Sequence, residues 1–320
     1  MKNIFYFTIL FLGFSLASCE HIIDFDGEIK SPKITINAIA VPDTIFTAVI
    51  LKEVFFTDAT PERKNESLYK QYVLDNAQAL ITVNGETTYR MNYNSENFNY
   101  ESLYIPKSGD KILINVNAPD FESVTTRAVV PTKNELQIIR SEVLYDKNYF
   151  ELDDWSDMAA TDTIMRITAK ITNVANEISY YRLIVRSIST VINANNNSVS
   201  GYEISDIFTS ADIIFKDARL TKRYKGWPIG FSNIFDNHLF KGKEYEFTVE
   251  SRKRWGKDQK VVIELQSISL DLYNYLKSTM IYRITEQDSY TESIQIYSNV
   301  TGGYGILGAL NGQKQTLYFY

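Results

Sequence analysis

The chain is short of the residues on which most metal and thiol chemistry depends. Its 320 residues include one cysteine and two histidines. A single cysteine excludes a disulfide within the chain, so the hydrophobic cores alone must hold the folded domains. Two histidines and no second thiol leave little for a zinc site or for cysteine-based catalysis. We therefore expect neither a metal nor a cofactor.

An excess of positive charge and a second long apolar run are also missing. The formal net charge is -6, which argues against nucleic acid as a partner. Beyond residue 20, no apolar run reaches the roughly 20 residues that a membrane-spanning helix needs. We therefore expect a soluble body, so any association with a membrane must come from the N-terminus.

The N-terminus has the pattern of an export signal. Lys2 precedes an apolar run over residues 4–14, a length typical of a secretory signal rather than of a membrane span. Residues 16–19 read Leu-Ala-Ser-Cys and resemble a bacterial lipobox, in which Cys19 becomes the lipidated first residue. The sequence predicts a signal peptide over 1–18 and a lipid anchor, such as palmitate, on Cys19. The alternative is an ordinary signal peptide with a chance cysteine.

Residues 19–31 are expected to form a lipid-anchored linker. Several acyl chains hold a protein at a membrane, whereas one chain binds only marginally. The linker carries acidic residues close to Cys19, a pattern that resembles the surface-export signal of Bacteroidota lipoproteins. We expect a protein anchored to the outer membrane and facing the cell exterior. A plain acidic linker is the alternative.

Aromatic residues are abundant, with 22 Tyr and 18 Phe, and this favours strands over helices. Residues 34–40 alternate between apolar and polar side chains, as a half-buried strand does. Asn84-Gly85 lies between two strand-like runs and is a strong hairpin signal. We predict a mainly β protein with two immunoglobulin-like β-sandwich domains, over 32–131 and 132–320.

One amphipathic helix is predicted in the second domain, near 270–284. Ser269 suits the N-cap, and Leu272, Leu276 and Met280 repeat at a spacing of four residues. We expect a strand pair, 243–255 with 259–267, across a short turn. The chain should end in strands over 305–310 and 317–320, with further strands over 136–145, 163–174 and 180–191.

The chain resembles a catalogued family, most specifically in two segments near its C-terminus. The Leu270–Leu276 segment and the Ser-Asn-Val-Thr-Gly-Gly-Tyr-Gly segment over 298–305 are similar to the signature of a Bacteroidota lipoprotein family described as a domain of unknown function, family 4249. The hallmark residues are Ser298, Asn299, Gly302, Gly303 and Gly305. The resemblance covers nearly the whole mature chain and implies a companion of TonB-dependent outer-membrane receptors. Members often carry Glu where Thr301 stands, so a role for that acid is not carried over.

The glycines of this hallmark have two interpretations. Their backbone N–H groups could approach an anion, as in phosphate-binding loops. No strand–loop–helix context is predicted around them, so a tight turn or bulge between strands is favoured. His238 is the one histidine of the folded body and has no recognisable nucleophile motif nearby. We therefore predict no catalytic residues.

Two basic, aromatic turns are the best candidates for a contact surface. Cations beside exposed indoles suit anionic or glycan ligands, and the alternative is that both are solvated hairpin tips. Asp-Thr-Ile occurs twice and resembles an O-glycosylation acceptor, with Thr44 and Thr163 as the acceptors. The candidate contact residues are Arg223, Tyr224 and Trp227 in one turn and Arg252, Arg254, Trp255 and Lys257 in the other.

The leading functional hypothesis is a non-enzymatic accessory or ligand-binding subunit of a TonB-dependent nutrient uptake system. It depends on the lipobox and on the family resemblance. Two alternatives stay open: a surface hydrolase that uses paired carboxylates, and a structural or adhesive surface protein.

Overall fold

A computed structural model describes residues 31–53, 70–146, 162–172, 176–192, 199–253, 257–286 and 294–319. Cys19, Arg254 and Trp255 lie outside these ranges. Strands account for 53% of the structure and helices for 9%, so the prediction of a mainly β protein is confirmed. No helix within the described ranges is long and apolar enough to cross a membrane.

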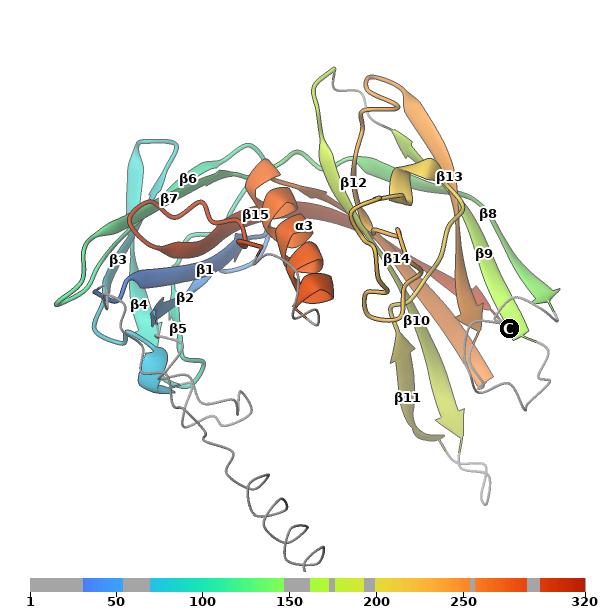
Figure 1. The fold of residues 1–320 in the computed structure, drawn as a ribbon, viewed down its shortest axis with the longest axis horizontal. Coiled ribbons are helices and arrows are strands. Elements are labelled where there is room, and N and C mark those ends of the chain that lie inside the picture. Colours follow the sequence, from blue (N-terminus) through green and yellow to red (C-terminus); the bar gives the residue numbers. More distant parts are fainter. Residues whose placement is uncertain are drawn as a thin grey trace, which may run out of the picture. The chain divides into compact units, whose positions relative to one another are not determined.

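The strands and helices follow one another along the chain as shown in Figure 1. Their bounds are β1 (Ile34–Ala40), β2 (Thr47–Lys52), β3 (Gln78–Val83), β4 (Thr87–Asn94), β5 (Asn99–Glu101), β6 (Lys111–Asn117), β7 (Val124–Val129), β8 (Glu135–Asp146), β9 (Asp162–Thr172), β10 (Tyr180–Ile192), β11 (Val199–Ser205), η1 (Ile213–Phe215), β12 (Ile234–Asp236), β13 (Glu244–Lys253), β14 (Lys257–Ile268), α3 (Leu270–Thr285) and β15 (Tyr304–Phe319).

Two sheets organise these strands. The larger has the order β11-β10-β14-β15-β1-β2-β5-β4-β3-β6-β7, with β12 paired to β10, and the smaller has the order β13-β9-β8. The pairing of β1 with β15 is parallel, whereas the other strand pairings between described residues are antiparallel. A parallel pair requires a long connection, and here most of the chain lies between the two partners.

Local patterns explain the first strands. In β1 the side chains of Ile34, Ile36, Ala38 and Ala40 are buried in alternation, which confirms the predicted strand. The chain then turns between β3 and β4 at Asn84-Gly85, where both residues have positive φ values of 54° and 75°. Because these two residue types tolerate the left-handed region, the predicted hairpin forms at this position.

The last strand, β15, connects the strands of the two halves of the chain. Its residues 304–309 pair with β1, and its residues 310–319 pair with β14 (Figure 1). The sequence predicted two separate strands here, and that prediction is wrong. One continuous strand forms because the first half of β15 pairs with β1 along one edge and the second half pairs with β14 along the other.

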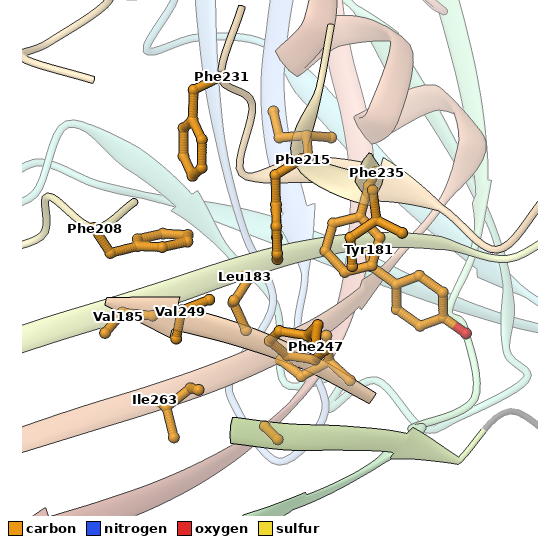
Figure 2. Close-up of a cluster of buried hydrophobic side chains, with 14 of the residues drawn as sticks. Tyr181, Leu183, Val185, Phe208, Phe215, Phe231, Phe235, Phe247, Val249 and Ile263 are labelled. Carbon is orange, nitrogen blue, oxygen red and sulfur yellow. The ribbon is translucent and has the colours of Figure 1, made fainter. Parts of the chain in front are cut away.

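Buried side chains form two clusters. One collects the inward-facing residues of β1–β7 together with Val300, Leu307 and Ala309. The other lies among β9, β10, β13, β14 and α3 and is rich in aromatic rings, with Phe215 near four other phenylalanines (Figure 2). The chain from Pro32 to Tyr320 forms one compact unit. The proposed division at residue 131 stays a prediction.

The expected hairpin between 243–255 and 259–267 does not form. β13 pairs with β9 in the smaller sheet, while β14 lies between β10 and β15 in the larger one. Both edges of β14 are therefore paired with β10 and β15, and neither is paired with β13, the strand that precedes it in sequence. The two segments pack face to face across the aromatic cluster, where burial of apolar surface outweighs local pairing.

Candidate functional site

Helix α3 supplies one wall of the site, and it forms as predicted. Ser269 is its N-cap, and its hydroxyl accepts a hydrogen bond from the Leu272 N–H at 3.3 Å. Leu272, Met280 and Ile284 are buried against the aromatic cluster. The same face also buries Lys277, which is 6% exposed. A buried lysine requires a partner, because desolvation of an unpaired ammonium is costly.

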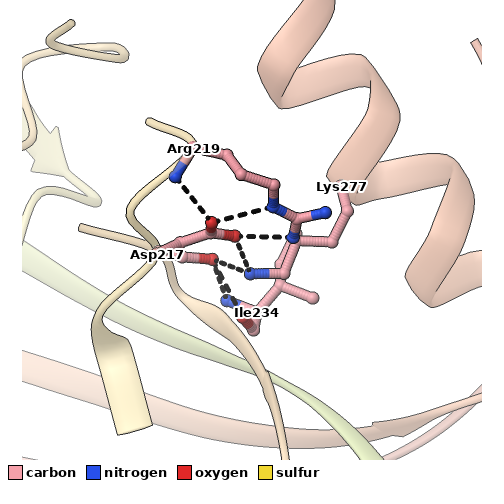
Figure 3. A network of polar contacts seen from close by, with 5 residues as sticks. Asp217, Arg219, Ile234 and Lys277 are labelled. Carbon is pink, nitrogen blue, oxygen red and sulfur yellow. Dashed lines mark hydrogen bonds and ion pairs between the residues drawn. The ribbon is translucent and has the colours of Figure 1, made fainter. Parts of the chain in front are cut away.

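That partner is Asp217. The Lys277 Nζ donates to Asp217 Oδ2 at 2.9 Å and to the Ser232 hydroxyl at 2.8 Å (Figure 3). Arg219 binds the same carboxylate from its other side. Its Nε donates to Oδ1 at 3.0 Å and its Nη2 to Oδ2 at 2.9 Å. One carboxylate therefore serves two cations, and both of its oxygens are occupied.

The segment that presents Asp217 is held by its own backbone and by the core. The Asp217 N–H donates to the Gly230 carbonyl at 2.8 Å, and the Gly230 N–H donates to the Leu220 carbonyl at 2.8 Å. Gly230 has a φ of 73°, which its missing side chain permits. Phe215 and Leu220 are buried on either side of the acid. The carboxylate thus has a fixed position below α3.

Charges in the network shift the pKa of each member. Burial alone would raise the pKa of Asp217, but the hydrogen bonds from Arg219 and Lys277 outweigh it and hold that pKa well below its ordinary value. Burial lowers the pKa of Lys277, and its bond to Asp217 opposes that effect. Burial, assisted by the charge of Asp236, raises the pKa of Tyr273 to about 12. Tyr273 is therefore a neutral phenol at physiological pH.

Beside this network lies a hollow of about 510 Å³, which we name the α3 cavity. Its walls combine Arg219, one side of α3 and residues 294–298. The two chain segments are joined by a 2.9 Å hydrogen bond from the Tyr297 N–H to the Ser278 hydroxyl. The helix contributes Tyr273, Asn274, Lys277, Ser278 and Ile281. Volume and mixed lining suit a small-molecule site, for which about 300–1,000 Å³ is typical.

Tyr297 separates the α3 cavity from a second hollow of about 460 Å³. Its hydroxyl donates to Asp271 Oδ1 at 2.5 Å, and burial followed by this bond raises its pKa to about 12. The second hollow is polar and is lined by Arg127, Asn299 and several threonines. The hallmark segment, 298–305, contributes to both hollows, with Ser298 in the first and Asn299 and Thr301 in the second.

The hallmark residues have structural contacts. Asn299 accepts the Leu307 N–H at 2.9 Å and donates to the carbonyls of Leu307 and Arg127 at 3.0 and 3.1 Å. It therefore ties β7 to β15. Ser298 also lines the α3 cavity and, through its hydroxyl, accepts the Val300 N–H at 3.3 Å.

The three hallmark glycines lie where backbones meet. A Cβ on Gly303 would lie 2.2 Å from the Ile34 carbonyl oxygen, and one on Gly305 would lie 2.0 Å from the Ile36 carbonyl oxygen. Gly302, with a φ of 83°, faces the Ser123 carbonyl in the same way at 3.1 Å. These contacts explain the glycines by close packing against β1 and β7, without an anion.

The first predicted contact turn is only partly exposed. Trp227 is 8% exposed and packs edge-on against Phe208 and Phe231, so the expectation of an exposed indole is wrong. The physical reason is the aromatic cluster, which offers the indole a large apolar surface. Tyr224 is half-buried and pairs with Trp227, while Arg223 is exposed.

The second predicted contact turn follows β13 and precedes β14. Arg252 and Lys257 occupy the ends of these strands, and their side chains, like Arg254 and Trp255 as a whole, lie outside the described residues. The two strands that flank this turn, β13 and β14, belong to different sheets and do not pair with each other.

The two predicted acceptor threonines differ in position. Thr44 is exposed in the connection between β1 and β2, where its hydroxyl donates to the Val41 carbonyl at 2.7 Å. Thr163 lies in β9, between β8 and β13, and its side chain is outside the described residues. His238 is exposed, with its Nδ1 3.3 Å from Asp236.

Sequence reasoning missed the Asp217–Arg219–Lys277 network. One signal for it was present: Lys277 precedes Met280 and Ile284 by three and seven residues, so it shares their buried face. Asp217 lay in a stretch without periodicity and gave no comparable signal. Within the described ranges, no group of three or more His, Cys, Asp or Glu residues could hold a metal ion.

Together, the sheets and the α3 cavity define a mainly β protein with a preformed concave site beside its one long described helix. The chain belongs to the family Domain of unknown function (DUF4249), whose model matches residues 20–316. The match includes α3, the hallmark segment and nearly all of β15. A comparison with curated proteins finds no match.

Proposed function

We propose that this protein is a lipid-anchored outer-membrane lipoprotein that binds a small ligand as an accessory subunit of a TonB-dependent nutrient uptake system. The α3 cavity carries the binding part of the proposal. It is concave, joins polar groups to apolar ones, and is held by a buried ion-pair network. Such preformed hollows are the usual places for small ligands.

The location and the partner are supported by sequence. Cys19 stands in a lipobox-like motif, and the family resemblance implies a companion of TonB-dependent receptors. A surface lipoprotein that captures a nutrient would raise its local concentration near a receptor on the same membrane. This part of the proposal requires no catalytic step.

The test is an affinity pull-down from outer membranes in mild detergent, with a C-terminally tagged chain. Recovery of a TonB-dependent receptor in near-equal amount is the expected result. The matched control carries Cys19→Ala, which removes the lipid attachment site and should leave the chain out of the membrane fraction. Recovery of the lipoprotein without a β-barrel receptor would contradict the accessory role and favour a free-standing binder, adhesin or enzyme.

A further inference from the structure

The charged groups that line the α3 cavity, among the residues that the structure describes, are cations. Arg219 and Lys277 contribute to its wall, and no carboxylate does so among the described residues. Asp217 lies behind them and binds both. Asp236, the other carboxylate within electrostatic reach of Lys277, does not line the cavity and has His238 at 3.3 Å. Among the described residues, the lining itself therefore carries two cations and no carboxylate.

Arg219 is the cation that a ligand can reach. Its side chain is 58% exposed, whereas that of Lys277 is 8% exposed and is committed to Asp217 and Ser232. A guanidinium has five N–H donors, and Asp217 receives one from Nε and one from Nη2. Figure 3 shows the remaining nitrogen, Nη1, without a contact among the residues drawn. The guanidinium of Arg219 is thus held by the Asp217 carboxylate and keeps further N–H donors for the acidic group of a ligand.

The rest of the lining suits an apolar body with few polar groups. Tyr273 and Tyr297 offer aromatic rings, and Ile281, Ile294 and Ile296 offer apolar surface. The Nζ of Lys277 lies 5.7 Å from the centre of the Tyr273 ring, within the range of a cation–π contact. Transfer of an apolar group of the ligand from water to this lining is favourable, and an acidic group on the same ligand could bind Arg219.

We infer that the α3 cavity takes a small carboxylic acid with an apolar or aromatic body, whose carboxylate binds the outward N–H groups of Arg219. This inference rests on the proposed role of the cavity as a ligand site. A carboxylate carries one negative charge and can bind the one well-exposed cation of the lining, Arg219. A phosphate can carry two, and the second would enter a partly apolar hollow without a partner.

The experiment compares phenylacetate with phenylacetamide, which has the same ring and no charge. Binding to the full mature chain carrying Cys19→Ala is followed by ligand-observed saturation-transfer NMR at millimolar concentrations. Phenylacetate should bind at least about tenfold more tightly than phenylacetamide. Equal binding of the two probes, or no binding of phenylacetate, would overturn the inference. Inorganic phosphate that displaces phenylacetate at equal concentration would also overturn it.

Substitutions of Arg219 then test whether this residue binds the carboxylate of the ligand. Arg219→Gln should abolish the preference for phenylacetate while phenylacetamide binds as before, which shows that the hollow is intact. Arg219→Lys should retain part of the preference, because it keeps the charge and loses the fork. The matched control is Arg283→Gln, which removes an exposed arginine of α3 outside the cavity lining. An equal loss in Arg283→Gln would assign the preference to net charge and refute the role of Arg219.

The receptor pull-down uses the chain with Cys19 intact, so the two proposals can fail separately. A receptor recovered with a chain that shows no carboxylate preference contradicts this inference alone. Carboxylate binding by a chain that recovers no receptor contradicts the uptake role alone.

Discussion

The ion-pair network below α3 should respond asymmetrically to loss of its members. Asp217→Asn replaces the shared carboxylate with a neutral amide and leaves the buried Lys277 ammonium without a counter-charge, beside the Ser232 hydroxyl. Breaking a buried pair in this way costs about 3–5 kcal/mol, because a charge stays behind without compensation. Lys277→Met leaves Asp217 bound by the Arg219 fork and places an apolar chain of similar length in the gap. We expect this change to cost about 1–2 kcal/mol.

The assay is equilibrium unfolding in urea of the chain carrying Cys19→Ala, followed by near-ultraviolet circular dichroism. The free energy of unfolding is compared among the parent, the two single variants and the double variant. The double variant should be more stable than Asp217→Asn alone, because it no longer contains the stranded ammonium. The resulting coupling energy between Asp217 and Lys277 should be about 1–3 kcal/mol.

One result would refute the reasoning. If Asp217→Asn costs no more than Lys277→Met, the carboxylate is not the element on which both cations depend. A coupling energy near zero would lead to the same conclusion. Glu86→Gln is a suitable control, since Glu86 is an exposed acid in the turn between β3 and β4 and should change stability little.

Three further outcomes follow from the structure. Gly305→Ala should prevent folding or sharply reduce soluble yield, because its Cβ would meet the backbone of β1. The control is Gly109→Ala: Gly109 has a similar φ of 88°, but its added Cβ would meet no atom within 4 Å, so the change should lower the free energy of unfolding by only about 1 kcal/mol. Phe215→Ala should lower the free energy of unfolding by about 3–5 kcal/mol, measured by urea titration, because it empties the centre of the aromatic cluster. The pKa of Asp217 is lower in the folded state than in the unfolded state, so its stabilising effect is present above about pH 4 and is lost as the pH falls toward the folded-state pKa. The melting temperatures of the parent and of Asp217→Asn should therefore converge in acid. Parallel curves of melting temperature against pH would contradict this.

Much of the fold could be predicted because its signals are local. The alternation over 34–40 indicates which side chains of β1 are buried, and this follows from the two-residue period of a strand. The turn at Asn84-Gly85 and the cap at Ser269 depend on the conformational preferences of single residues. Such features need no information from the rest of the chain.

The pairing of distant segments could not be predicted in the same way. The adjacent segments 243–255 and 259–267 suggested a hairpin across residues 256–258, but β13 and β14 lie in different sheets. Trp227 stood among basic residues and suggested an exposed contact, but the ring cluster buried it. In both cases the deciding energy is the burial of apolar surface against residues far away in sequence.

By itself, the sequence determined the preference for strands, the start of α3 with the burial of Leu272 and Met280, and the hairpin at β3 and β4. Short-range sterics and side-chain periodicity decide these features, because they act within a few residues. It also carries the lipobox-like motif at Cys19, which is read directly from residue order. Only the tertiary structure decided that β15 joins β1 to β14, and that Lys277 of the helix meets Asp217. Those contacts depend on how two hydrophobic clusters pack, and packing brings together groups whose distance along the chain carries no signal of their meeting.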